Sequence, residues 1–139
     1  MRRIAISDCT LKNIAKEGGV SLLFREKTAV ARCIDRFGAD AIELSPVKNP
    51  KEDAIICKTI GSFANAVLCV EAGSTKESIA QAWECVKTAK KPRLEIALPV
   101  STVQMEYTYH LKAEKMSLKV AELVRAAKDL CDDVQFTAL

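Results

Sequence analysis

The chain has 139 residues, of which 49% are hydrophobic, 28% charged and 5% aromatic, and its formal net charge is +3. This length accommodates one ordinary domain with a core, and the apolar fraction excludes a disordered tail. The longest apolar runs, such as 96–100, fall short of the roughly 20 residues of a membrane span. No apolar signal-peptide segment follows the first residues. We therefore expect one soluble, cytoplasmic domain.

The basic residues do not form a nucleic-acid-binding pattern. Lysines are spread along the chain, and no aromatic residues are interleaved with the densest basic stretch, 87–93. That stretch ends a helical segment, where cations favour the helix dipole. We therefore expect neither nucleic acid nor a membrane as a partner.

Six cysteines are spread over the chain without C-x-x-C or zinc-ribbon spacing, at positions 9, 33, 57, 69, 85 and 131. Each lies in an apolar pattern, so we interpret them as small buried hydrophobic residues in a reducing compartment. A disulfide framework and a reactive thiol are the alternatives. Cys9 is the candidate for a reactive thiol because it follows the first predicted strand.

Strand and helix patterns alternate through the first half of the chain. A short β-type run covers 4–6, and a helix stripe over 24–37, with Cys33 on its apolar side, ends at a glycine. The next strand covers 39–44. An asparagine cap followed by proline then starts a helix over about 49–61. An uninterrupted apolar strand follows at 66–70.

The alternation continues to the last residue of the chain. A second capping signal at 74–77 starts a helix, and a fourth strand covers 94–100. A polar, aromatic loop is predicted over about 102–115. Ser117 is then expected to cap a helix, and the fifth strand covers 134–139.

This β-α-β-α-β-α-β-α-β order predicts an α/β fold with a parallel sheet. Right-handed crossovers favour a sheet in which successive strands are added on the same side. A five-stranded doubly wound sheet and an arc of a (β/α)8 TIM barrel both fit, and a whole barrel would need about 250 residues. In both folds ligands gather at the carboxyl ends of the strands.

The charged and polar residues at those strand ends are the candidate site. Lys12 and Asn13 follow the first strand and Glu43 ends the second, and together they could bind a carboxylate, a carbonyl or a metal. A structural ion pair is the alternative. Glu43 lies in an otherwise apolar strand, so its charge needs a partner, and Lys12 is the candidate. His110, the only histidine, cannot form a histidine-rich metal site.

Four segments carry a family resemblance. Residues 6–13 resemble the D-x-T-L-R-D-G-x-Q motif of the DRE-TIM metallolyases, the family of 2-isopropylmalate synthase, homocitrate synthase and HMG-CoA lyase. Residues 38–44 resemble the family's G-x-D-x-I-E strand, 101–107 its S-x-I-H-x-E segment, and 132–137 its D-D-V-E-F-S strand. The motifs occur in family order. They favour the barrel arc, with strands in the order 1-2-3-4-5.

The resemblance implies that residues 1–139 are the N-terminal half of a barrel enzyme. In that family a divalent metal activates an acyl or keto acid for condensation of an acyl-CoA with a 2-oxo acid, or for the reverse cleavage. Lys12 stands at the family's arginine position and Asn13 at that of its metal-ligating aspartate, and Glu43 would support Lys12. Gln104, at the histidine position, and Thr137, at the serine position, would line the substrate site.

Two functions follow as hypotheses. The first is a synthase or carbon–carbon lyase relative in which Lys12 and Glu43 polarise the substrate. The second is a non-catalytic half-barrel that binds a partner or forms a homo-oligomer, because a lone arc is expected to have open strand edges and an apolar inner face. A doubly wound domain of unrelated function is the third possibility.

Overall fold

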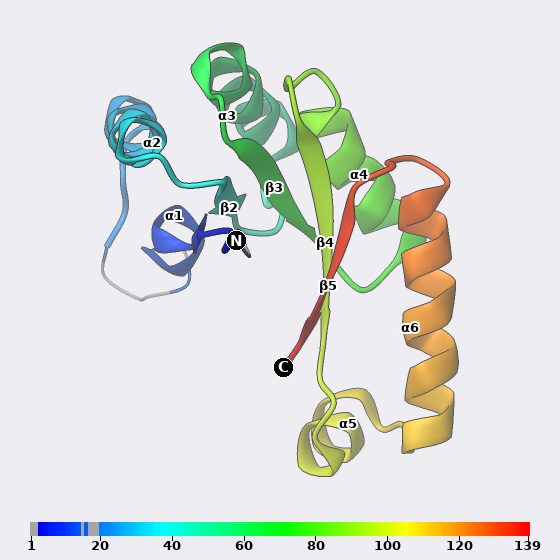
Figure 1. Cartoon of the computed structure of the whole chain (residues 1–139). Helices are drawn as coiled ribbons and strands as arrows, with labels where there is room; N and C mark the ends of the chain where they lie inside the picture. The colour runs from blue at the N-terminus through cyan, green and yellow to red at the C-terminus, as the bar shows by residue number, and fades with distance from the viewer. Residues whose placement is uncertain (1–2, 15, 17–19) are drawn as a thin grey trace.

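The computed structural model describes residues 3–14, 16 and 20–139, in which five strands alternate with helices (Figure 1). The elements in chain order are β1 (Ser7–Asp8), α1 (Thr10–Ile14), α2 (Phe24–Phe37), β2 (Ala41–Leu44), α3 (Pro50–Phe63), β3 (Val67–Ala72), α4 (Lys76–Val86), β4 (Pro92–Leu98), α5 (Thr102–Tyr109), α6 (Ala113–Lys128) and β5 (Val134–Ala138). None of the described helices combines the length and apolarity needed to cross a bilayer.

The five strands form one parallel sheet in the order β1-β2-β3-β4-β5. A doubly wound sheet would reverse direction at a switch point, and this sheet does not. The fold is therefore an α/β half-barrel, consistent with the predicted partial TIM barrel. Helices α2, α3, α4 and α6 pack against β2, β3 and β4 on what would be the outer side of a barrel (Figure 1).

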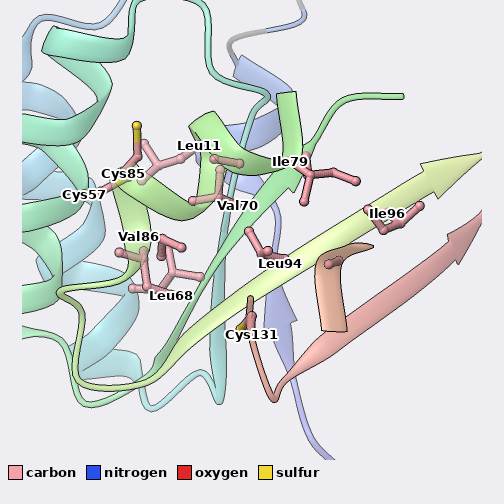
Figure 2. Close-up of a cluster of buried hydrophobic side chains, with 14 of the residues drawn as sticks. Leu11, Cys57, Leu68, Val70, Ile79, Cys85, Val86, Leu94, Ile96 and Cys131 are labelled. Carbon is pink, nitrogen blue, oxygen red and sulfur yellow. The ribbon is translucent and has the colours of Figure 1, made fainter. Parts of the chain in front are cut away.

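The core fills the space between the sheet and these helices. Leu68 of β3 and Leu94 of β4 point toward α4, where Ile79 and Val86 are buried with them (Figure 2). Residues at alternate positions of a strand share a face, so every second residue of β3 and β4 faces the helices. Burying this apolar surface is the main favourable term in folding, at about 25 cal/mol per Å².

The cysteines are divided between the core and the surface. Four are buried, as predicted: Cys57, Cys69, Cys85 and Cys131. Cys9 and Cys33 are exposed, so the prediction is wrong for these two. In α2 the buried residues are Ala31 and Ile34, whereas Cys33 lies on the exposed side of the helix. None of the four buried thiols, nor the two exposed ones, forms a disulfide in the structure.

The first strand differs from its prediction. Strand pairing begins at Ser7, which lies opposite Ala41. The strand predicted over 4–6 is therefore displaced to Ser7–Asp8. The carbonyl of Ile6 accepts hydrogen bonds from the N–H groups of Asp40 and Ala41. Ile4 is 81% exposed, because no described element covers the apolar run that suggested a strand there.

The predicted loop over 102–115 is also wrong. Ser101 caps helix α5, its hydroxyl accepting the N–H of Gln104 at 3.3 Å. Helix α6 begins at Ala113, so Ser117 lies inside it and does not cap it. Helix α5 buries only Met105 of its own residues. It therefore has almost no apolar stripe from which periodicity could predict it.

Candidate functional site

The inner face of the half-barrel, opposite the helices, is polar. Strand register places Glu43 beside Cys69 and Arg93 in one row, and Glu71 beside Glu95 in the next. The expected apolar inner face is therefore wrong. The strands looked continuously apolar because their outer residues are aliphatic, whereas polar residues occupy alternate positions.

Lys12 lies at the centre of this face. It belongs to the short helix α1, which follows the carboxyl end of β1, and it is 7% exposed. Its Nζ lies 2.5 Å from Glu95 Oε2, 3.2 Å from Glu43 Oε2 and 3.3 Å from Glu71 Oε2. The expected pairing of Lys12 with Glu43 is present. We call Lys12, Glu43, Glu71 and Glu95 the Lys12 cluster.

The neighbouring strands hold the outer oxygens of the cluster. Ser7 Oγ donates to Glu43 Oε1 at 2.6 Å, and Thr137 Oγ1 donates to Glu95 Oε1 at 2.6 Å. Gln135 Nε2 lies 3.5 Å from Glu43 Oε1 and 3.3 Å from Thr137 Oγ1. All five strands thus contribute a side chain to one network, in which the predicted Thr137 takes part.

Sequence reasoning did not single out Glu95. In the structure this side chain is fully buried. It stands between Leu94 and Ile96 in an apolar strand. An acidic residue in such a strand was the signal that identified Glu43, and the same signal could have found Glu95. A buried carboxylate needs a charged or hydrogen-bonding partner, and Glu95 has two, Lys12 and Thr137.

The surroundings of Lys12 and Glu43 favour the charged form of both side chains. Burial alone would lower the pKa of Lys12, but its hydrogen bond to Glu95, the charge of Glu95, its hydrogen bond to Glu43 and the charge of Glu71 raise it. Burial alone would raise the pKa of Glu43, but hydrogen bonds from Ser7 and Lys12 outweigh it and lower the pKa. Lys12 is thus an ammonium and Glu43 a carboxylate.

We expect acid to weaken the fold partly through Glu43. Because its pKa is lower in the folded chain than its ordinary 4.5, its charge stabilises the fold above that pH, and this contribution is lost as pH falls through the folded pKa. Glu43→Gln should therefore flatten the acid limb of stability measured by urea unfolding below about pH 4.5. The exposed Glu114→Gln is the control. Equal acid slopes for Glu43→Gln and the native chain would contradict this.

Two other predicted site residues lie at the surface. Asn13 is exposed, and its Nδ2 lies 3.2 Å from Cys9 Sγ. Gln104 is exposed in α5, which follows the carboxyl end of β4. The side-chain contacts of the Lys12 cluster described above include neither residue. His110 ends α5 with a left-handed backbone and is likewise exposed.

The described residues do not fit a divalent metal. The family's position for a metal-ligating aspartate holds Asn13, a neutral amide that is exposed. Within 3–14, 16 and 20–139, no group of three or more histidine, cysteine or acidic side chains is arranged to hold a metal ion. The three carboxylates of the Lys12 cluster instead direct an oxygen to the ammonium.

The five parallel strands follow one another across the sheet in chain order, and a charged network lies on their inner face. This is the arrangement of a partial (β/α)8 barrel. The chain belongs to the HMGL-like family, whose model matches residues 3–139. It is 33% identical over 137 residues to a 2-isopropylmalate synthase of Clostridium kluyveri, covering 98% of this chain and 27% of the relative.

Two further relatives show the same relation. A 2-isopropylmalate synthase of Gloeothece citriformis is 35% identical, covering 97% of this chain and 26% of the relative. One of Bacillus velezensis is 31% identical, covering 99% and 27% respectively. The chain thus spans about a quarter of the length of the curated relatives it matches. The resemblance of the four motifs to this family is confirmed.

Proposed function

We propose that the chain forms the N-terminal strands of an acyl-CoA-dependent synthase or lyase of the 2-isopropylmalate synthase type. The observation that supports this is a buried ammonium, Lys12, at the inner face of a half-barrel and in contact with side chains of three strands. In barrel enzymes the chemistry lies at this end of the strands. The substrates would be an acyl-CoA and a small 2-oxo acid.

Lys12 would supply positive charge where the reaction develops negative charge. When a base has removed a proton from the α-carbon of an acyl-CoA, the resulting enolate carbon adds to the carbonyl of a 2-oxo acid. The carbonyl π bond breaks and its oxygen becomes an oxyanion, which a fixed cation stabilises until it takes up a proton. The contacts of Lys12 to Glu43 and Glu71 are longer than its contact to Glu95. A substrate oxygen would displace one of these two, while Glu95 holds the ammonium in place.

The remaining predicted residues have supporting roles in this proposal. Glu43 orients Lys12, and Thr137, through its hydrogen bond to Glu95, holds the opposite side of the cluster. Gln104 would contact the part of the substrate that extends from the strand ends toward α5. No step is assigned to a metal, because the donor set at Asn13 does not suit one.

The test is release of free CoA thiol from acetyl-CoA with a panel of 2-oxo acids, with and without a chelator. We expect turnover by the full-length protein that carries these strands, and a loss of about 10²–10³-fold in Lys12→Met, as for removal of an oxyanion donor. Lys16→Ala, which removes the 49% exposed neighbouring ammonium, should retain turnover. Thiol release no greater than in blanks lacking the 2-oxo acid would contradict the proposal.

A non-catalytic half-barrel is the second candidate. One observation favours it: the Lys12 ammonium donates hydrogen bonds to Glu43 and Glu95 and forms an ion pair with Glu71, all in its own chain. In this case the chain would act by self-association or by binding a protein partner. Sedimentation velocity separates the two candidates, since an inactive chain that forms a defined homo-oligomer supports the second. A well-behaved monomer argues against it.

A further inference from the structure

One side chain joins the last strand of the sheet to the second across the inner face. Gln135 of β5 places its amide nitrogen, Nε2, 3.5 Å from Glu43 Oε1 and 3.3 Å from Thr137 Oγ1. Strands β2 and β5 are separated in the sheet by β3 and β4, so backbone pairing does not connect them. Of the side chains in the described ranges, Gln135 is the one through which β5 reaches Glu43. The amide therefore adds a connection across the arc that the strand ladder does not supply.

Arg93 determines which way this amide faces. Its Nη1 lies 3.4 Å from Gln135 Oε1, and its Nε donates to Asp133 Oδ1 at 2.9 Å. A guanidinium can only donate hydrogen bonds, and a carboxylate can only accept them. The amide oxygen therefore faces Arg93 and the amide NH2 group faces Glu43, because a reversed amide would place donor against donor on one side and acceptor against acceptor on the other.

The two N–H groups of Gln135 act on both acids that accept hydrogen bonds from Lys12. One N–H points to Glu43, whose Oε2 lies 3.2 Å from Lys12 Nζ. The other points to the Thr137 hydroxyl, which accepts from the amide and therefore directs its own proton to Glu95 Oε1 at 2.6 Å. Glu95 Oε2 in turn accepts from Lys12 Nζ at 2.5 Å. One amide thus orients the acids on two sides of the ammonium.

Without this amide, each of the two acids would keep only a hydroxyl donor besides the ammonium. Ser7 Oγ donates to Glu43 Oε1 at 2.6 Å, but a hydroxyl rotates freely and carries a single proton. The amide is planar and is held by three partners. We propose that Gln135 is a positioning residue, which acts through Glu43 and Thr137 to hold the ammonium of the cluster where the oxyanion of the substrate forms. This inference rests on the proposed function.

The test compares thiol release by the full-length protein with that of variants whose fold is checked by circular dichroism. In Gln135→Met the amide is lost. We expect kcat to fall about 10–100-fold while KM for the acyl-CoA changes by less than about twofold, because a misplaced charge is felt mainly in the transition state. Gln81→Met makes the same change at an exposed glutamine of α4 and should keep the native kcat. A native kcat in folded Gln135→Met, or a loss confined to KM, would overturn the proposal.

The isosteric variant Gln135→Glu provides a readout that a merely structural role would not change. The introduced carboxylate would face the acids Glu43 and Glu95. Its cationic neighbours are Arg93, which already pairs with an aspartate, and Lys12, which lies beyond the two acids. As an anion it cannot donate to Glu43, whereas once protonated it can donate there and accept from Arg93. We expect kcat, relative to the native value at the same pH, to recover about tenfold between about pH 8 and about pH 5. A ratio that does not change with pH would contradict the proposal.

A measurement without substrate separates this inference from the proposed function. The protons of a buried, hydrogen-bonded ammonium exchange slowly with solvent, so heteronuclear NMR of the native protein should detect the ammonium of Lys12. We expect Gln135→Met to increase its exchange rate about tenfold and Gln81→Met to leave it unchanged. If thiol release is absent but exchange changes in this way, the proposed function is wrong and the positioning of Lys12 by Gln135 stands. Equal exchange rates in Gln135→Met and the native protein are incompatible with that positioning.

Discussion

Replacing Lys12 with methionine should lower the free energy of unfolding by about 3–5 kcal/mol, the usual cost of removing one partner from a buried ion pair. Methionine keeps most of the apolar stem but removes the charge. Glu43 and Glu95 would then remain buried without their cation. Urea unfolding at pH 7, followed by circular dichroism, measures the loss. The two chains are compared with the same slope of unfolding free energy against urea concentration.

The matched control is Lys16→Met, which removes an ammonium bound to the same carboxylate, Glu71. The side chain of Lys16 is 49% exposed, and exposed ion pairs contribute about 0–1 kcal/mol. We therefore expect a loss within that range. Similar losses in the two variants would contradict the view that burial makes the Lys12 cluster critical, and a gain in stability in Lys12→Met would exclude it.

The sequence predicts most of the fold because strands and helices have different periods. Strands β2 to β5 lie within a few residues of their expected positions, since their apolar runs are bounded by turn or capping residues. The order of the strands in the sheet does not follow from these periods. A doubly wound sheet and a barrel arc produce the same alternation, so only the motif resemblance favoured the arc that the structure has.

The part of the site that the sequence predicted is the pair formed by Glu43 and Lys12. Glu43 stood out as a charge in an apolar strand, and Lys12 was its expected partner. The convergence of Glu71 and Glu95 on the same ammonium depends on strand register, which periodicity does not supply. Asn13 and Gln104 are exposed because α1 and α5 turn them outward, and neither helix was predicted.

Leu94→Ala should be the other large effect, a loss of about 2–5 kcal/mol in the free energy of unfolding. Leu94 is fully buried and pairs in register with Val70 on one side and Val134 on the other. Its side chain fills the space between β4 and the helices (Figure 2). Truncation leaves a cavity there, since a central strand held on both sides cannot move to close it.

The control is Leu118→Ala in α6, where the leucine is 72% exposed and the change should stay within about 0.5 kcal/mol. A second readout separates the two faces of β4, because Leu94 and Glu95 are adjacent but point to opposite sides. Leu94→Ala should lose stability equally at pH 7 and pH 4, keeping the acid slope that Glu43→Gln is expected to flatten. If its acid slope also flattens, the outer core and the Lys12 cluster are energetically coupled through the strand, and the cluster does not act as an independent unit.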